Sequence, residues 1–483
     1  MEYSKEDYYP MHMPGHKRNT ALLKEFHPYA IDITEIDGFD NLHHAEGIIK
    51  ELLQRIERVY RSEKSYLLIN GSTVGILAGI QACVNRGDTI LMARNCHKAV
   101  YNAVILNELK PVYVYPQEDG IYGIHGGILP EKIEELLITH PEIKLVVLTS
   151  PTYEGIVSDM AKIVEICHNH KAKVLVDEAH GAHLGFHPAF PMNSIQAGAD
   201  VVIHSIHKTM PAFTQTAIMH VNDDIRLQQR VETYLGIYET SSPSYLLMAG
   251  VDQCIGLLEE KSEELFEEYH RNLCEFYEDM QGLHHLQVMR GSDYKKEEIR
   301  NHGIAEVDAS KILISVKNTT ITGKTLANTL LEKYKIQLEM STLDYALAMT
   351  SICDTKEGFW RLRNALYEID SNLCSKLEEK QDRKSCGNAF EAAIKQKLSP
   401  YEAISAKTEN IGFLSSEGRV TARHIMVYPP GIPIVAAGEM IAAEAIVFVM
   451  KAIKEGLEVL GLEQNPDHSW DCCVVQKEES VGR

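Results

Sequence analysis

The sequence predicts an α/β protein with a large, mostly parallel sheet flanked by helices, followed by smaller α/β units. From about residue 65 onward, short apolar runs alternate with stretches of helical period, a pattern typical of parallel strands covered on both faces. Two of these runs, 174–176 and 201–203, each lead into residues suited to chemistry. The chain of 483 residues is longer than one hydrophobic core usually organises, so two or three domains are expected.

The expected elements follow one another in a regular order. A turn-rich and then helical N-terminal segment (1–60) precedes a large domain (61–300), a small α/β domain (301–380) and a C-terminal domain (381–483). The last 20 residues of the chain are polar and are expected to be loosely held. Strands are expected at 66–69, 89–92, 112–115, 145–148, 174–176, 201–203, 216–221 and 312–315. Helices are expected at 76–84, from 97, and at 130–139, 160–170, 253–281, 323–334, 356–379 and 439–457.

Charge and composition argue against several classes of protein. The 48 basic and 68 acidic residues give a net charge of −20, which disfavours nucleic acid and anionic membranes as partners because both bind basic patches. The ten cysteines have no C-x-x-C or metal-like spacing, as expected for reduced thiols in the cytoplasm. The N-terminus lacks the apolar core of a signal peptide, and no apolar stretch is long enough to span a bilayer. We therefore expect a soluble, cytoplasmic protein.

The turn Gly71-Ser72-Thr73-x-Gly75 follows the first apolar strand and opens a helix. Backbone N–H groups and two hydroxyls at a helix N-terminus form a site for a dianionic phosphate. Ordinary capping of the helix is the alternative role for Ser72 and Thr73. The turn is not a Walker loop, because no Gly-Lys-Ser/Thr follows it.

Asp177 and Lys208 each follow an apolar strand. If these strands are adjacent and parallel, both side chains lie at the carboxyl edge of the sheet, where α/β proteins bind ligands. Buried lysine is rare unless it is paired or chemically employed. An aspartate for a pyridinium nitrogen and a lysine for an aldehyde are what pyridoxal 5'-phosphate (PLP) needs from a protein. The alternatives are a strand-end cap for Asp177 and a solvated loop lysine for Lys208.

Neighbouring residues complete the predicted cofactor site. Ala179 is small enough for a flat ring to lie against it, and His97, at the start of a helix, could stack on the other face of the ring. Ser205 and His207 flank Lys208 and could reach the phosphate. The chain has 22 histidines, so a structural role is the alternative for His97. No metal site is expected, because no histidine pair has an assigned third ligand.

Seven short motifs occur in a fixed order along the chain. They are Met13-Pro-Gly-His-Lys17, Asn70-Gly-Ser-Thr-x-Gly75, Arg94-Asn-x-His-Lys98, Ser150-Pro-Thr-Tyr153, Asp177-Glu-Ala-His-Gly181, Ser205-x-His-Lys208 and Tyr428-Pro-Pro-Gly-Ile-Pro433. Together they resemble the ornithine/lysine/arginine decarboxylases, PLP enzymes of the aspartate-aminotransferase fold (fold type I). The resemblance extends from about residue 10 to 460, nearly the whole chain.

The resemblance implies a role for each residue of the predicted site. Lys208 would bind the cofactor covalently, Asp177 would pair with the pyridinium nitrogen, and His97 would stack on the ring. Thr152 or His180 would lie near the phenolic oxygen. The phosphate ligands would be Ser72, Thr73, Ser205 and His207.

The resemblance also implies an assembly. Enzymes of this fold are generally homodimers with active sites at the interface, to which segment 240–245 would contribute a phosphate contact. The large members of the family carry an N-terminal domain used for higher assembly. Only about 60 residues precede the sheet here, so a short form without that assembly is expected. The family's Pro-Gly-Glu after Tyr-Pro-Pro-Gly appears here as Ala437-Gly438-Glu439.

The implied reaction is α-decarboxylation of a basic amino acid to carbon dioxide and an amine, with a role related to polyamines. The sequence leaves arginine, lysine and ornithine open as substrates, and both biosynthesis and acid resistance open as roles. A cationic side chain needs a carboxylate at the far end of its pocket. The candidates are Glu439, Glu35, Asp37 and Asp40.

Two other functions are compatible with the same residues. One is transamination on the same scaffold, for which Arg361, Arg363, Arg419 or Arg423 could bind the α-carboxylate. The other is a non-catalytic regulator that binds a polyamine or a partner protein. The intact pair of Asp177 and Lys208 disfavours the regulator, because a retired enzyme has no reason to retain both.

Overall fold

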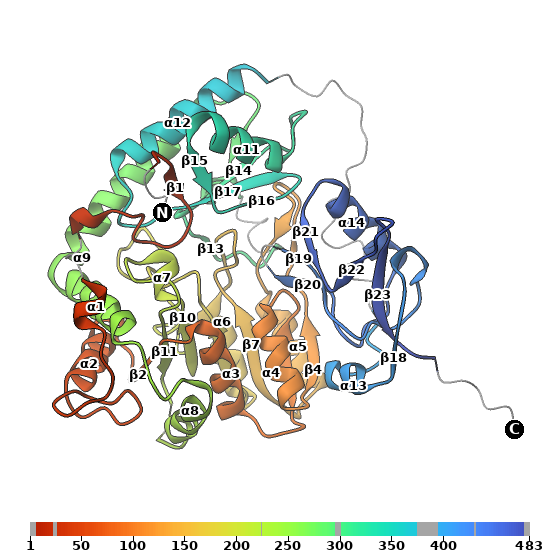
Figure 1. Cartoon of the computed structure of the whole chain (residues 1–483), viewed down its shortest axis with the longest axis horizontal. Coiled ribbons are helices and arrows are strands. Elements are labelled where there is room, and N and C mark those ends of the chain that lie inside the picture. The colour runs from red at the N-terminus through yellow and green to blue at the C-terminus, as the bar shows by residue number, and fades with distance from the viewer. Residues whose placement is uncertain are drawn as a thin grey trace, which may run out of the picture.

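The computed structural model describes residues 6–22, 27–223, 225–294, 301–373, 395–428 and 431–477. A large unit carries a smaller unit on one side and a C-terminal unit on another (Figure 1). The expected boundary near 380 lies outside the described residues, and the one near 300 borders residues outside them. The division into four segments therefore stays a prediction.

The large unit is built on a seven-stranded sheet of order β2-β11-β10-β9-β7-β3-β4. Strands from β10 to β4 pair in parallel, and β11 is antiparallel to both of its neighbours. Central strands such as β9 and β10 are apolar at successive positions because both of their faces are buried. The predicted large, mostly parallel sheet is confirmed. Its strands are β2 (Lys64–Leu68), β3 (Thr89–Ala93), β4 (Lys110–Val114), β7 (Ile143–Thr149), β9 (Lys173–Asp177), β10 (Val201–His204) and β11 (Ala217–Val221).

Helix α3 (Gly71–Cys83) packs directly on this sheet between α4 (Lys98–Leu106) and α8 (Ile225–Tyr238). Two glycines permit its close approach. A Cβ atom at Gly75 would lie 2.6 Å from Leu68 Cδ1, and one at Gly79 would lie 2.8 Å from Leu175 Cδ1. The glycines therefore fix the depth at which the N-terminus of α3 meets the edge of the sheet.

The remaining helices of the large unit form two further groups. Helices α5 (Pro130–Thr139) and α6 (Met160–Asn169) pack on each other. The long helix α9 (Tyr245–Asp279) contacts α2 (Ile48–Tyr60) of the large unit and α12 (Lys356–Ser371) of the smaller unit. Figure 1 shows α9 and α12 running along one side of the molecule, so α9 joins the two units.

The smaller unit contains a four-stranded antiparallel sheet of order β12-β14-β17-β16. Helix α11 (Gly323–Tyr334) packs on this unit, and the N-terminal strand β1 (Tyr9–Met11) pairs in parallel with its strand β15 (Ile336–Leu338). The beginning of the chain is thus held by residues more than three hundred positions away. The sheet strands are β12 (Gln287–Val288), β14 (Lys311–Ser315), β16 (Met340–Ser341) and β17 (Tyr345–Met349).

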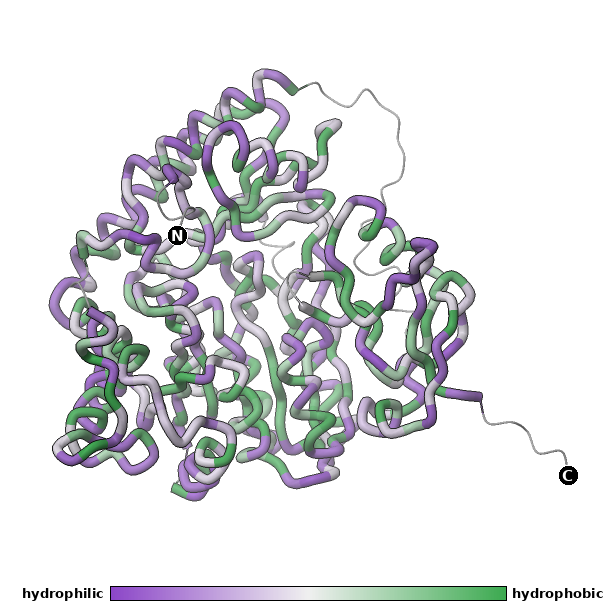
Figure 2. Tube along the Cα trace, in the orientation of Figure 1, coloured by the Kyte–Doolittle hydropathy of each residue, from purple (hydrophilic) through white to green (hydrophobic). Residues whose placement is uncertain are grey.

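The C-terminal unit has two three-stranded sheets and a core of its own, which includes Phe413, Ile425 and Val474. Hydrophobic residues are concentrated inside each unit (Figure 2). Helix α13 (Pro400–Ser405) contacts α4 of the large unit. The other elements are β18 (Thr408–Gly412), β19 (Ile425–Tyr428), β20 (Ile432–Val435), α14 (Ala443–Lys454), β21 (Glu458–Leu460), β22 (Leu462–Gln464) and β23 (Trp470–Val475).

The expectation of a loosely held tail is wrong for β23. This strand lies between β18 and β22, and Cys472 and Val474 are buried. The reason is the short apolar run at 472–475, which supplies a strand although the surrounding residues are polar.

A buried ion pair joins the C-terminal unit to the large sheet. Arg94, directly after β3, donates from Nη2 to Glu439 Oε2 (2.8 Å) and from Nε to Glu439 Oε1 (3.1 Å). Its Nη1 donates to the Tyr101 hydroxyl (2.9 Å) and to the Pro433 carbonyl (2.7 Å). Glu439 is fully buried. The prediction that Glu439 binds the substrate's cation is therefore wrong, because Arg94 already occupies both of its oxygens.

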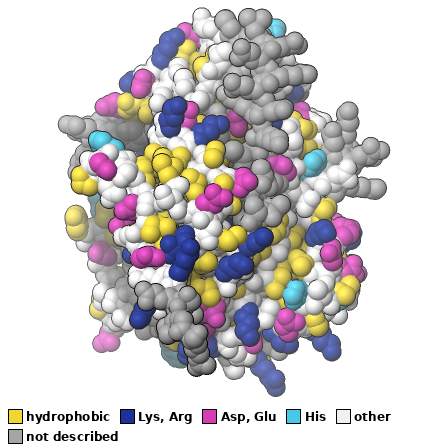
Figure 3. Space-filling view, turned by 90° about the vertical axis from the view of Figure 1, so that its right-hand side faces the viewer, with side chains coloured by type: hydrophobic (Ala, Val, Ile, Leu, Met, Phe, Trp, Pro, Cys, Tyr) yellow, Lys and Arg dark blue, Asp and Glu magenta, His cyan; other side chains and the backbone are white. Residues whose placement is uncertain are grey.

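Among the described residues, no helix combines the length and the apolar character needed to cross a bilayer. On the face formed by the C-terminal unit, basic and acidic side chains are intermixed with hydrophobic ones (Figure 3).

The buried pair leads to a stability prediction. Glu439→Gln should lower the free energy of unfolding by about 3 kcal/mol or more, because it leaves the Arg94 charge buried without its counter-charge. Urea denaturation followed by circular dichroism measures the change. The matched control is Glu463→Gln, which removes an exposed partner of Arg423 and should cost about 1 kcal/mol at most. Equal unfolding midpoints for the two variants would contradict the prediction.

Candidate active site

The carboxyl ends of β7, β9 and β10 meet at one cavity of about 300 Å³. Strands β9 and β10 are adjacent and parallel, with Ile203 opposite Asp177. Asp177 ends β9, and the short helix α7 (Ile206–Thr209) after β10 carries Lys208. The predicted placement of both residues at the carboxyl edge of the sheet is therefore confirmed, and both line the cavity.

Lys208 and His180 contact each other in the cavity. Lys208 Nζ lies 2.9 Å from His180 Nε2. Burial lowers the pKa of Lys208, an effect that the carboxylates of Asp177 and Glu339 partly oppose. A lowered pKa increases the fraction of neutral amine near pH 7, and the neutral amine is the nucleophilic form.

Asp177 presents a buried carboxylate to the same space. The side chain is 4% exposed, and its Oδ1 accepts a hydrogen bond from Ala179 N (3.2 Å). Burial raises the pKa of Asp177, and the charge of Lys208 acts in the opposite direction. A cation in the cavity would therefore stabilise the ionised carboxylate.

Polar groups gather at the N-terminus of α3. Gly71 has a φ of +82° and is followed by Ser72 and Thr73, which line the cavity. Ser205 Oγ donates to Ser72 Oγ (2.8 Å). His207 Nδ1 donates to the Thr216 carbonyl (2.8 Å). The helix N-terminus and these hydroxyls form a site suited to an anion.

His97, Ala179 and Thr152 line the remaining walls. Burial and the charge of Lys208 lower the pKa of His97 to about 4, so its ring is neutral near pH 7. The ring of His97 caps α4, with Nδ1 accepting from Ala99 N (3.3 Å). His180 stacks at an angle on Tyr153, with 4.3 Å between ring centroids. All ten residues predicted to bind the cofactor thus line one cavity, although their individual roles stay predictions.

The chain matches the family model described as Orn/Lys/Arg decarboxylase, major domain, over residues 1–308 and the corresponding C-terminal domain over residues 380–462. It belongs to the Orn/Lys/Arg decarboxylase family. An arginine decarboxylase of Halalkalibacterium halodurans is 33% identical over 474 residues, which cover 96% of this chain and 94% of that protein.

Solved structures show the same fold. A lysine decarboxylase of Francisella novicida superposes with a TM-score of 0.78 at 21% identity, covering 91% of this chain and 73% of that one. An ureidoglycine–glyoxylate aminotransferase of Bacillus subtilis gives a TM-score of 0.52 at 13% identity, covering 67% of this chain and 84% of that one. The fold is therefore that of fold type I enzymes, as the motifs predict.

The residues of the cavity fit the cofactor that the family resemblance implies. PLP presents an aldehyde, a ring nitrogen and a dianionic phosphate. The cavity offers an amine of lowered pKa on Lys208, a buried carboxylate on Asp177 and the N-terminus of α3. His180 Nδ1 is buried and has no hydrogen-bond partner among the described residues, so a polar ligand would also satisfy this atom.

Several other predicted residues do not reach the cavity. Asp40 accepts hydrogen bonds from Glu46 N, Gly47 N and Ile49 N (2.9 Å each) and so orders the start of α2. Ser244 caps α9. Glu35 and Asp37 are not among the lining residues. Arg361, Arg363, Arg419 and Arg423 pair instead with Asp7, Asp279, Glu409 and Glu463, respectively.

The sequence prediction missed other residues of the cavity. Glu154 is 8% exposed, lines the cavity, and accepts a hydrogen bond at Oε1 from the Tyr345 hydroxyl (2.7 Å). It directly follows the motif that ends at Tyr153, which was its one signal in the sequence. The cavity also includes Met13, Asn95, His125, Thr149, Tyr153 and Ile432. No group of three metal-type ligands occurs among the described residues.

The size of the cavity can be tested at Ala179. Ala179→Leu should weaken PLP binding at least tenfold, because a larger side chain occupies the space that a flat ring needs. Absorbance titration with PLP measures the affinity, and circular dichroism checks the fold. Ala189→Leu, at an exposed position, is the matched control. Unchanged affinity in the Ala179 variant would show that the ring lies elsewhere.

Proposed function

We propose that the chain is a PLP-dependent decarboxylase that converts a basic amino acid into carbon dioxide and the corresponding amine. The observation that carries the proposal is a half-buried lysine and a buried aspartate that line one cavity, which also includes Glu154. Membership of the Orn/Lys/Arg decarboxylase family and the names of relatives such as the arginine decarboxylase support the same reaction.

The residues of the cavity divide the work. PLP, when bound, supplies an electron sink for the pair released as the bond between the α-carbon and the carboxylate breaks. The buried carboxylate of Asp177 would stabilise a proton on the ring nitrogen. Lys208 Nζ, 2.9 Å from His180 Nε2, can exchange a proton with that ring and carry one to the α-carbon. His97 and Ala179, which line the cavity, would contact the two faces of the ring and exclude water from them.

Glu154 replaces Glu439 as the proposed ligand of the substrate's distal cation. Asp177 and Glu154 are the acidic residues that line the cavity among the described residues, and Asp177 is assigned to the cofactor. A buried carboxylate binds an ammonium or guanidinium group through charge-assisted hydrogen bonds. The Tyr345 hydroxyl, which donates to Glu154, fixes the direction of the carboxylate.

Transamination receives less support from the cavity. Aminotransferases of this fold usually bind the α-carboxylate with an arginine, and the residues found to line the cavity include none. Each of the four candidate arginines pairs with an acidic residue elsewhere. The regulator remains the weaker alternative because Asp177 and Lys208 are both present.

We further propose a homodimer in the cytoplasm, with a role in polyamine formation. Four large apolar side chains of the N-terminal segment are exposed, those of Tyr29, Ile36, Phe39 and Ile48. They support a subunit interface there, because association would remove them from water. Gel filtration with light scattering tests the dimer.

The role of Glu154 leads to a kinetic prediction. Glu154→Gln should raise KM for the basic substrate about tenfold or more and change kcat less, because it removes a charge that binds the distal group rather than the reacting bond. Glu142→Gln, at an exposed site, is the control. An unchanged KM in the Glu154 variant would exclude this residue as the distal ligand.

Product analysis tests the reaction itself. The protein with PLP is incubated separately with arginine, lysine and ornithine, and mass spectrometry detects carbon dioxide and the amine. We expect one of the three to give its amine, and Lys208→Ala to give none. A PLP-loaded protein that forms a keto acid and no carbon dioxide would favour transamination and overturn the proposal.

A further inference from the structure

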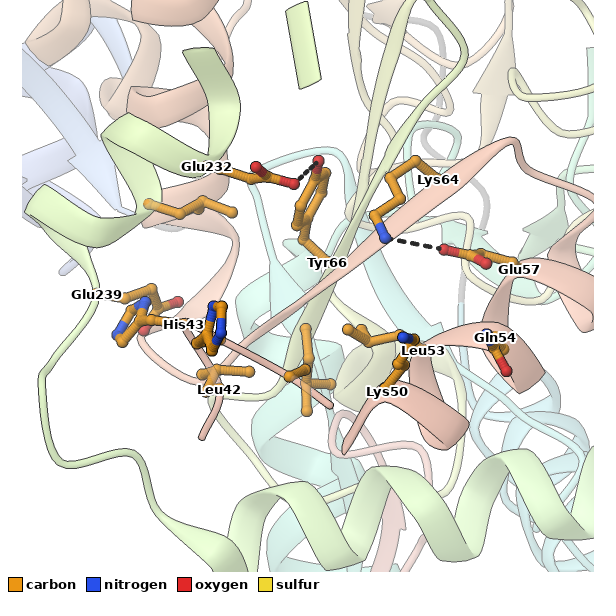
Figure 4. A pocket seen from close by; sticks show the side chains of 14 residues that line it. Leu42, His43, Lys50, Leu53, Gln54, Glu57, Lys64, Tyr66, Glu232 and Glu239 are labelled. Atoms are coloured by element: carbon orange, nitrogen blue, oxygen red, sulfur yellow. Dashed lines mark hydrogen bonds and ion pairs between the residues drawn. The ribbon is translucent and has the colours of Figure 1, made fainter. Parts of the chain in front are cut away.

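A second cavity, of about 390 Å³, lies between α2, β2 and α8. It is distinct from the Lys208 cavity, and the two share no lining residue. Figure 4 shows Glu232 and Glu239 at one side of it, Lys64 and Glu57 at the opposite side, and Leu42 and Leu53 below. Its volume lies in the range of small-molecule sites.

Glu239 has an unsatisfied acceptor in this cavity. The residue is 7% exposed, and its Oε1 accepts hydrogen bonds from Ile69 N (3.2 Å) and Asn70 N (3.4 Å). Its Oε2 is buried and has no hydrogen-bond partner in the described part of the chain. Burial also raises the pKa of Glu239. A buried carboxylate oxygen without a donor is unfavourable. A ligand that brings a hydrogen-bond donor, and above all a cationic one, would therefore be stabilised at Oε2.

Glu232 supplies a second acceptor on the same helical face. It lies on α8, seven residues before Glu239, which directly follows the helix. This spacing corresponds to about two turns and about 10 Å. Its Oε1 accepts from the Tyr66 hydroxyl (3.1 Å), and Figure 4 shows this bond. Glu232 is exposed, and its carboxylate can accept further hydrogen bonds beside the one from Tyr66.

The rest of the lining favours a short hydrocarbon chain between two cationic ends. Lys64 is paired with Glu57 (3.8 Å), so their charges offset each other. Lys50 is exposed. The lining contains three glutamates, two lysines and the histidines His43 and His44. Apolar wall is provided by Leu42, Leu53, Leu67 and Leu235, which suits methylene groups.

We propose that this cavity is a second ligand site that binds an aliphatic diamine, with one ammonium group on Glu239 and the other on Glu232. An aliphatic diamine is the amine that the Lys208 cavity would release from lysine or ornithine. The interpretation as product sensing therefore rests on the proposed function with one of these two substrates. A diamine bound at Glu239 would also affect the Lys208 cavity through the backbone. The Ile69 and Asn70 amides that Glu239 accepts from directly precede the Gly71-Ser72-Thr73 turn.

Equilibrium dialysis of the PLP-loaded protein with labelled 1,4-diaminobutane tests the site. The variants are Glu239→Gln and Glu232→Gln. The second keeps an acceptor for the Tyr66 hydroxyl and leaves the hydrogen bonds of Glu239 to Ile69 N and Asn70 N in place. We expect Glu239→Gln to weaken diamine binding about tenfold or more and Glu232→Gln about threefold, because the first carboxylate is buried and the second is exposed. Glu51→Gln, exposed on α2 and outside the cavity, should bind as the unmodified protein does.

Two comparisons separate this site from the Lys208 cavity. Glu154→Gln should leave this class of binding unchanged, and 1-aminobutane, which has a single ammonium group, should bind at least tenfold more weakly. If Glu154→Gln weakens the binding and Glu232→Gln does not, the diamine lies in the Lys208 cavity and the second site is overturned. The assay measures binding and requires no catalysis, so it tests the second site even if the decarboxylation proposal fails.

Discussion

The burial of an amine and a carboxylate at the carboxyl edge of two adjacent parallel strands is the constraint on which the rest of the site depends. Lys208 and Asp177 lie where water is largely excluded, so each shifts the pKa of the other, and burial opposes both charges. The parallel pairing of β9 and β10 brings the two residues to the same edge, and Gly75 and Gly79 let α3 approach the sheet closely there.

The C-terminal unit contributes to the Lys208 cavity, and the ion pair of Arg94 and Glu439, which lies outside the cavity, holds this unit in place. Ile432 of β20 lines the Lys208 cavity. The next residue, Pro433, accepts a hydrogen bond from Arg94 Nη1 (2.7 Å), and Arg94 is fixed in turn by Glu439. Since Arg94 directly follows β3, the edge of the large sheet determines where Ile432 lies. Glu439 therefore contributes to the cavity by positioning its wall.

Features that depend on local sequence patterns could be predicted, whereas features that depend on contacts between distant residues could not. The strands, the turn at Gly71 and the residues after β9 and β10 followed from apolar runs and their endings, and the structure brings all ten cofactor candidates to one cavity. Glu439 was misassigned because a carboxylate that binds a ligand and one that pairs with an arginine 345 positions away have the same local sequence. Glu154 was missed because its direction is set by Tyr345, on another strand of another unit.

The Gly71-Ser72-Thr73 turn connects the two cavities. Ser72 and Thr73 line the Lys208 cavity, and Glu239 of the second cavity accepts hydrogen bonds from the two residues before the turn. Residues 69–71 are held from one side by Glu239, through the Ile69 and Asn70 amides, and from another by Gln215, whose Nε2 donates to the Ile69 carbonyl (2.5 Å). Gly71 then adopts a positive φ that side chains rarely tolerate. A backbone fixed on both sides directs its N–H groups without rearrangement. Any change in the charge of Glu239 therefore alters the hydrogen bonds that orient the turn, and an ionised carboxylate accepts them more strongly than a neutral one.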